Sequence, residues 1–363
     1  MNKYGIKLFC IIVSFLALFT GCQMDSKNKS YITENNFDMK AASSVAEAYM
    51  NYLVKDDTDN IKKLYSKELL NTPTKNENKN LNILGYNLAN SSQVGKSGIF
   101  IMNVCRSSKE KPFASLDQYS IKIIKEGNNY KISETNNIIQ REVFIYKNKI
   151  RLKNKNDANS NLVMSMRGLP NYVFSKDDKV NIDKIQVPRR RFGMLNFSYN
   201  GNLLAITSVD TNTYIGIISI DDSLIVQGQS GGNQESGKGN EDTSQSQDDM
   251  ETSIGKEITS IDLLKNSKVN FMGFSKDEKF LAVQYSNDSV NSCIRVYKVD
   301  GGDMVKYKFE ENFPMDKVNV TFSSFDEDVL NFDVIAKSKQ DDSINNITGK
   351  WQLDLKEFKA IRM

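Results

Sequence analysis

One short pattern occurs twice in this sequence, and the repeat decides the fold. LNFSYNGNLLAI (residues 195–206) and MGFSKDEKFLAV (residues 272–283) each place Phe-Ser before a polar turn. An apolar run of strand-forming residues follows the turn in both. Asn-Gly and Asp are typical of tight turns, because such turns need a positive φ or a side chain that bonds its own backbone. Both stretches are therefore predicted to form a strand, a turn and a second strand.

Aligned positions in the two stretches give specific expectations. Phe197 and Phe274 precede the turn in each copy, and we expect both to be buried. The pairs at residues 200–201 and 277–278 are predicted to be exposed turns. A weaker third copy, VTFSSFDEDVLNFDV (residues 320–334), places Phe322 in the same position.

The spacing of the copies indicates a repeat architecture. Phe274 and Phe322 are about 48 residues apart, and Phe197 and Phe274 are about 77 apart. The longer interval contains residues 227–257, which are rich in Gly, Ser, Gln, Asn and acids. Such a composition cannot bury enough surface to fold, so this insert is predicted to be disordered. Without it, both intervals fall in the 40–50-residue range of a propeller blade.

These units resemble the blades of WD40-type and TolB-type propellers, whose blades often contain FSPDGKxLAF. The WD dipeptide is absent from this chain. The resemblance implies an all-β, propeller-like domain at residues 146–363 with about four irregular blades, the first at residues 150–175. A β-sandwich is the alternative.

The preceding segment predicts an α+β domain at residues 38–145. Apolar residues from Ala42 to Leu53 have helical spacing, with Asp57 or Thr58 as the N-cap of a second helix. The stretch YSIKIIKEGNNYKI (residues 119–132) alternates as a β-hairpin does. Helices followed by such a sheet resemble the NTF2-like cone domains of secreted bacterial lipoproteins. That resemblance implies a pocket beside the first helix.

Four tyrosines in this domain could line the implied pocket, although aromatic residues at these spacings also occur in cores. They are Tyr49, Tyr52, Tyr86 and Tyr119.

The N-terminus is predicted to be a lipoprotein signal. Lys3 and Lys7 precede a run of apolar residues that is typical of a signal peptide and short for a membrane span. The segment ends in Phe-Thr-Gly-Cys, which resembles a bacterial lipobox. The resemblance implies a signal peptide at residues 1–21, cleavage between Gly21 and Cys22, and acylation of Cys22. A polar tether at residues 22–37 would then hold the protein on the outer face of the bacterial cytoplasmic membrane.

Composition excludes several classes of function. The chain has no histidine, so Ser-His and Cys-His triads and His-dependent metal sites are excluded. We expect no cofactor and no metal. Removing Lys3 and Lys7 from a net charge of +3 leaves +1, so no nucleic-acid partner is expected. The run Arg189-Arg190-Arg191 favours a solvated loop, with a partner or lipid-headgroup contact as the alternative. Cys105 and Cys293 are expected to be isolated buried thiols.

Together these features favour a non-enzymatic, membrane-anchored interaction module that contacts a protein or a wall polymer. The alternative is a small-molecule sensor or carrier that uses the NTF2-like pocket. An enzyme would have to rely on carboxylates, and none of these is paired at a telling spacing.

Overall fold

The structure is a computed structural model that describes residues 37–72, 81–178, 180, 182–224, 251–338 and 342–363. Residues 38–363 form one compact unit, which is mostly β. The predicted signal peptide, the tether up to residue 36 and most of the predicted insert lie outside the described residues.

The unit begins with helices, as predicted. α2 (Met39–Val54), α3 (Thr58–Leu64) and α4 (Lys67–Leu70) have Asp38, Asp57 and Ser66 as their N-caps. Each of these side chains accepts a hydrogen bond from a backbone N–H of the first turn, which otherwise has no partner within the helix. α2 buries Ala42, Ala46, Tyr49 and Met50.

A six-stranded antiparallel sheet follows, and its strands are paired in chain order. α2 packs across its first four strands. The hairpin predicted at residues 119–132 is confirmed, with Glu126 opposite Asn129 and Gly127 at φ +62°. The strands are β1 (Asn82–Val94), β2 (Ser97–Ser107), β3 (Phe113–Glu126), β4 (Asn129–Tyr146), β5 (Lys149–Asn154) and β6 (Asn161–Ser165).

This sheet does not support the NTF2-like cone. It continues on both sides of the domain boundary predicted after residue 145, because Ile150 of β5 pairs with Ile145 of β4. The predicted first blade at residues 150–175 is wrong for the same reason. β5 and β6 belong to the first sheet, and β7 (Tyr172–Phe174) pairs with β8 (Lys184–Gln186) in a two-stranded sheet. The division into domains stays a prediction.

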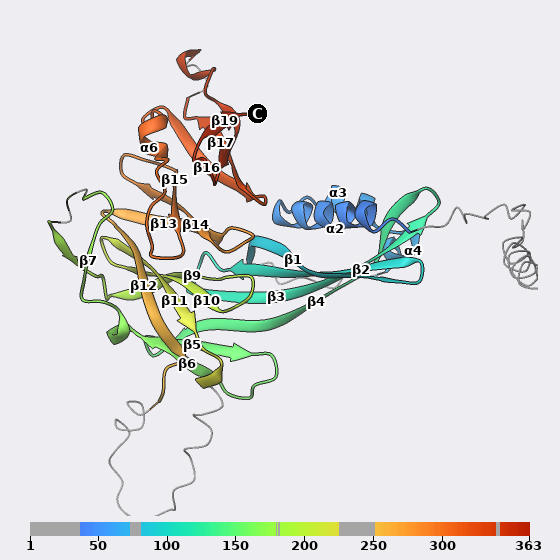
Figure 1. The fold of residues 1–363 in the computed structure, drawn as a ribbon, viewed down its shortest axis with the longest axis horizontal. Coiled ribbons are helices and arrows are strands. Elements are labelled where there is room, and N and C mark those ends of the chain that lie inside the picture. The colour runs from blue at the N-terminus through green and yellow to red at the C-terminus, as the bar shows by residue number, and fades with distance from the viewer. Residues whose placement is uncertain (1–36, 73–80, 179, 181, 225–250, 339–341) are drawn as a thin grey trace, which may run out of the picture. The chain divides into compact units, whose positions relative to one another are not determined.

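Three blade-like antiparallel sheets complete the described part of the chain, where about four blades were predicted (Figure 1). Each sheet is a meander in chain order, which is the arrangement within a propeller blade. The first contains β9 (Arg191–Phe197), β10 (Leu203–Val209), β11 (Thr213–Ile220) and β12 (Gly255–Leu264). The second contains β13 (Ser267–Phe274), β14 (Phe280–Asn287) and β15 (Cys293–Lys298). The third contains β16 (Val318–Phe325), β17 (Val329–Ala336), β18 (Gly349–Asp354) and β19 (Ala360–Arg362).

The repeat that predicted these sheets is confirmed for its two strong copies. Phe197 ends β9 opposite Leu204, and Phe274 ends β13 opposite Leu281. Both phenylalanines are buried. The two stretches are therefore equivalent strands of successive sheets.

The third copy matches the other two copies only when the alignment is shifted from Phe322 to Phe325. Phe325, rather than Phe322, ends β16, pairs with Leu330 and is buried. Phe322 is half-buried and lies before an irregularity between Phe322 and Ser324. The expected equivalence of Phe322 with Phe197 is therefore wrong.

The predicted insert is shorter than expected at its C-terminal end. Residues 255–257 belong to β12, and Ile254 is buried and donates its N–H to Leu162 O at 2.8 Å. β12 needs these residues because it pairs with β11 along its length.

The β9–β10 turn joins the six-stranded sheet to the blade-like sheets. Arg141 Nη1 donates to Gly201 O at 2.7 Å, and Asn103 Nδ2 donates to Tyr199 O at 2.9 Å. Tyr199 OH donates to Phe274 O at 3.2 Å. One turn therefore contacts β2, β4 and β13.

This junction corrects the expectation that both repeated turns are exposed. Gly201 is buried at φ +78°, and a Cβ there would lie 2.9 Å from Arg141 Nη1. Glu278 is half-buried, and its Oε1 accepts a hydrogen bond from Asn200 N at 2.8 Å. Asn200 and Asp277 are exposed, as predicted.

Candidate functional site

Two cavities form one continuous groove beside the first strands of the blade-like sheets. Their volumes are about 670 and 490 Å³. We call the larger cavity the polar end and the smaller one the aromatic end. Both are lined by Ser108, Lys109, Met194, Lys268 and Val269.

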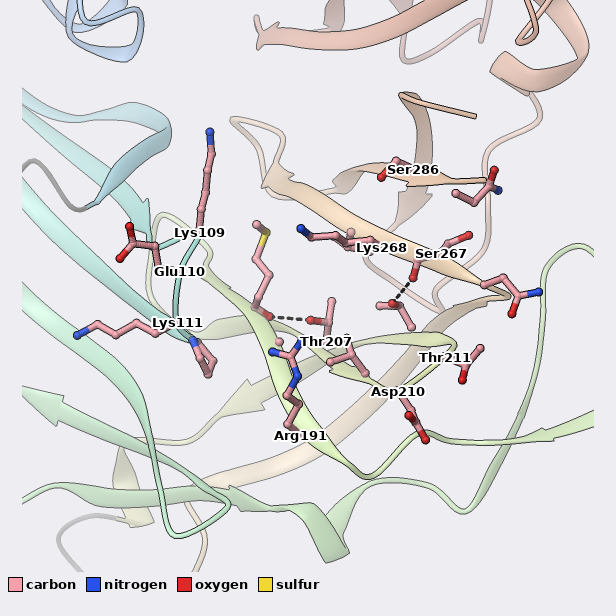
Figure 2. Close-up of a pocket in the computed structure, with 18 of the residues that line it drawn as sticks. Lys109, Glu110, Lys111, Arg191, Thr207, Asp210, Thr211, Ser267, Lys268 and Ser286 are labelled. Carbon is pink, nitrogen blue, oxygen red and sulfur yellow. Dashed lines mark hydrogen bonds between the residues drawn. The ribbon is translucent and has the colours of Figure 1, made fainter. Parts of the chain in front are cut away.

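The polar end is built from segments that are far apart in the sequence (Figure 2). Its walls are the loop between β2 and β3, the start of β9, and three turns between neighbouring strands. Thr207 Oγ1 donates to Met194 O at 3.3 Å, and Thr213 Oγ1 donates to Ser267 O at 2.6 Å. These bonds attach β10 to β9 and β11 to β13, so the wall is part of the sheets.

Charged side chains of both signs line the polar end. Arg191 of β9 and Lys268 of β13 reach into it from different strands (Figure 2). Asp210 Oδ1 lies 3.8 Å from Arg190 Nη1, and both side chains are exposed. The cations are Lys109, Lys111, Arg191 and Lys268, and the acids are Glu110, Asp210 and Asp288.

The aromatic end differs from the polar end in its charge. No Asp or Glu is among the described residues that line it. The rings of Phe271 and Phe322 stack there with centroids 4.4 Å apart. Gln284 Oε1 accepts a hydrogen bond from Phe322 N at 2.8 Å, which ties β14 to β16. The groove therefore changes from a charged, hydroxyl-bearing surface to an aromatic one along its length.

The four predicted pocket tyrosines do not converge on one cavity. Tyr49 and Tyr119 are buried in the core, and Tyr52 is half-buried on α2. Tyr86 lines a third cavity of about 220 Å³, which adjoins the aromatic end and shares Val54, Leu84, Phe322 and Ser323 with it. Its hydroxyl donates to Asn51 Oδ1 at 2.8 Å, and burial raises the pKa of Tyr86 above its usual value. Their role as pocket residues stays a prediction.

A buried charge network lies between the first two blade-like sheets, and the sequence did not indicate it. Arg295 donates to Asp262 at 3.2 Å, and to Asp177 and Glu310 at 2.7 Å each. Tyr297 OH also donates to Asp262 at 2.7 Å. Asp262 is on β12, Arg295 is on β15, and Glu310 is on α6 (Phe309–Asn312). The network joins these elements, and its acids and its cation already have partners.

Other predicted sites are placed as follows. Gly21 and Cys22 lie outside the described residues. Cys105 and Cys293 are free and buried, as predicted, and burial raises the pKa of both thiols.

Within the described part of the chain, no cluster of three or more Cys, Asp or Glu side chains is arranged to hold a metal ion. A search of the described helices finds none with the length and apolarity of a membrane span.

Sequence reasoning missed the groove because its residues form no motif. Lys109, Arg191 and Lys268 come from three separate segments. The one signal was the run of three arginines, which favoured a solvated loop. Arg189 instead donates to Leu169 O at 2.6 Å, and Arg191 lines the groove.

Comparison with protein-family models and with curated proteins finds no match. Solved structures that match include a puromycin hydrolase, with 6% identity, 75% of this chain and 46% of that chain covered, and a TM-score of 0.29. A puromycin-hydrolysing peptidase of Mycobacterium tuberculosis matches with 8% identity, coverage of 77% and 52%, and a TM-score of 0.18. The β-propeller domain of Cps50 from Myceliophteria thermophila matches with 8% identity, coverage of 69% and 96%, and a TM-score of 0.25. The chain thus spans about half the length of the two hydrolases.

The described strands and their meanders give the chain a mostly β, propeller-like architecture. The comparisons bear on one expectation. The expectation that the chain is not an enzyme is contradicted, because peptidases are among the matched structures, and it is withdrawn. At this identity and TM-score, the matches assign no activity to the chain.

Proposed function

We propose that this protein is a binding module that holds a partner in the groove between the six-stranded sheet and the blade-like sheets. The observation that carries the proposal is the continuity of the two cavities, which share five lining residues. An open groove of this kind, with distributed polar groups and an apolar end, suits an extended partner better than a compact metabolite.

The proposal includes a membrane anchor. Its support is the N-terminal sequence, in which a positive segment, an apolar run and Gly21-Cys22 follow one another. Two or three acyl chains on Cys22 would suffice for stable anchoring. The groove would then face a protein or wall partner outside the cytoplasmic membrane.

Site-specific photo-crosslinking in intact cells tests both parts of the proposal. A photoreactive residue replaces exposed Thr211, which lines the groove, or exposed Asn128 in the β3–β4 turn, which does not. A crosslinked partner should form from position 211 and not from position 128. Cys22→Ala should leave the chain unlipidated and uncleaved before residue 22, which the mass of the mature protein measures. Equal crosslinking at both positions, or none at 211, would refute the groove, and an unchanged mature mass would refute the anchor.

The second candidate is a small-molecule sensor or carrier. The observation in its favour is the cavity of about 220 Å³ that Tyr86 lines. A ligand there would protect Tyr86 from chemical modification without blocking the crosslink at position 211.

A further inference from the structure

The aromatic end of the groove is lined by two cations. They are Lys109 and Lys268, and no acid is among the described residues that line this end. Both lysines are exposed, and neither forms an ion pair among the described residues. By contrast, Arg106, Arg141 and Arg295 each pair with a carboxylate. Two cations that line the same cavity without partners favour an anionic group in it.

An aromatic surface lies beside these lysines. Phe271 and Phe322 are half-buried, and their rings are 23° from parallel. Exposed aromatic pairs of this kind favour apolar or aromatic side chains of a partner, as hot spots in interfaces do. The aromatic end therefore combines a binding position for an acid with one for an apolar group.

The polar end has acids as well as cations along the path that a polyanion would have to follow. Glu110, Asp210 and Asp288 line it, and like charges brought together in an interface weaken binding. A nucleic acid or an anionic membrane surface carries negative charge along its whole length. A peptide carries separate charges and can match both ends.

Resting on the proposed function, we propose that the groove binds an extended peptide segment of a partner protein. An acidic side chain of that segment lies between Lys109 and Lys268. A neighbouring aromatic or aliphatic side chain packs on Phe271 and Phe322. A basic residue further along the segment faces Asp210 or Asp288 at the polar end. Because Lys109 and Lys268 line both ends, the acid lies between the other two groups, and the recognised order is base, acid, aromatic.

An array of octapeptides containing glutamate, phenylalanine and lysine in all orders tests this pattern on the purified full chain. Peptides in which the acid lies between the base and the aromatic residue should be enriched. The double variant Lys109→Glu, Lys268→Glu should bind them at least about tenfold more weakly, since it removes two ion pairs and adds repulsion.

The matched control is Lys298→Glu with Lys306→Glu, which changes the net charge equally at exposed lysines outside the groove. It should bind within about twofold of the wild type. No enrichment on the array, or equal losses in both double variants, would overturn the inference. So would groove-dependent binding of anionic vesicles or an oligonucleotide in place of the peptides. If the peptide inference fails in one of these ways and a crosslink still forms at position 211, the groove binds a partner of another chemistry.

Discussion

Single residues connect the repeated turns of this protein to one another. Gly201 and Glu278 occupy the same position of the two copies, and both have positive φ, at +78° and +60°. The sequence alignment predicted that these positions are equivalent. It could not predict that the Glu278 carboxylate accepts a hydrogen bond from Asn200 of the other turn, because that contact depends on how the two sheets pack.

Glu278→Ala should lower the free energy of unfolding by about 1–2 kcal/mol, because Asn200 N loses a charged acceptor that is partly shielded from water. Glu278→Gln should cost less, since its amide oxygen can still accept this bond. Burial raises the pKa of Glu278 above the usual pKa of a glutamate. The folded state therefore holds this proton more tightly than the unfolded state, and the free energy of unfolding falls as the carboxyl group ionises with rising pH. The Gln variant should therefore gain stability relative to the wild type between pH 4 and pH 7. Urea unfolding at both pH values measures this, and Lys279→Ala, at an exposed site, is the control. A loss in Lys279→Ala equal to that in Glu278→Ala would contradict this role.

At the scale of elements, the strands were predictable where the pattern has a period of two and not where that period is interrupted. β9 and β13 follow the predicted register through their closing phenylalanines. In β16 the irregularity between Phe322 and Ser324 changes which side chains face the core. Phe322 and Phe325 are both aromatic residues that precede the turn after β16. Only the packing of β16 determines that Phe325 is buried and Phe322 is half-buried.

Phe325→Ala should cost about 3–5 kcal/mol, the usual loss for emptying a buried aromatic site, and so should Phe197→Ala. Phe322→Ala should cost about 1–2 kcal/mol, because its half-exposed ring loses mainly its contacts with Phe271 and Phe325. Chemical denaturation of the three variants gives the comparison. Were Phe322→Ala the more damaging substitution, the alignment of the third copy at Phe322 would be the better one.

At the scale of the whole molecule, the sequence predicted the kinds of element better than their assembly. Local periodicity indicates strands and turns, whereas the groove and the Arg295 network depend on side chains brought together from distant segments. Asp177 and Arg295, for example, are 118 residues apart. The six-stranded sheet also shows this limit, because β5 and β6 have ordinary strand patterns. Only the pairing of β5 with β4, and of β6 with β5, assigns them to the first sheet.

The buried tyrosines make the stability of the whole unit sensitive to alkaline pH. Burial raises the pKa of Tyr214 and Tyr307 to about 12, and it also raises the pKa of Tyr199 and Tyr297. In the unfolded chain they ionise near pH 10. Above that pH the folded state binds more protons than the unfolded state, so the free energy of unfolding should fall as pH rises. Each fully buried tyrosine contributes at most about 1.4 kcal/mol per pH unit.

Urea unfolding between pH 9 and pH 12, with tyrosinate absorbance as a second signal, should show unfolding and ionisation occurring together. Tyr307→Phe removes one of these groups and should make the fall in stability less steep. Tyr146→Phe, at a site that is 57% exposed, is the control and should leave the slope unchanged. Stability that stays constant up to pH 12, or tyrosinate that forms fully before the chain unfolds, would show that these hydroxyls reach water in the folded protein.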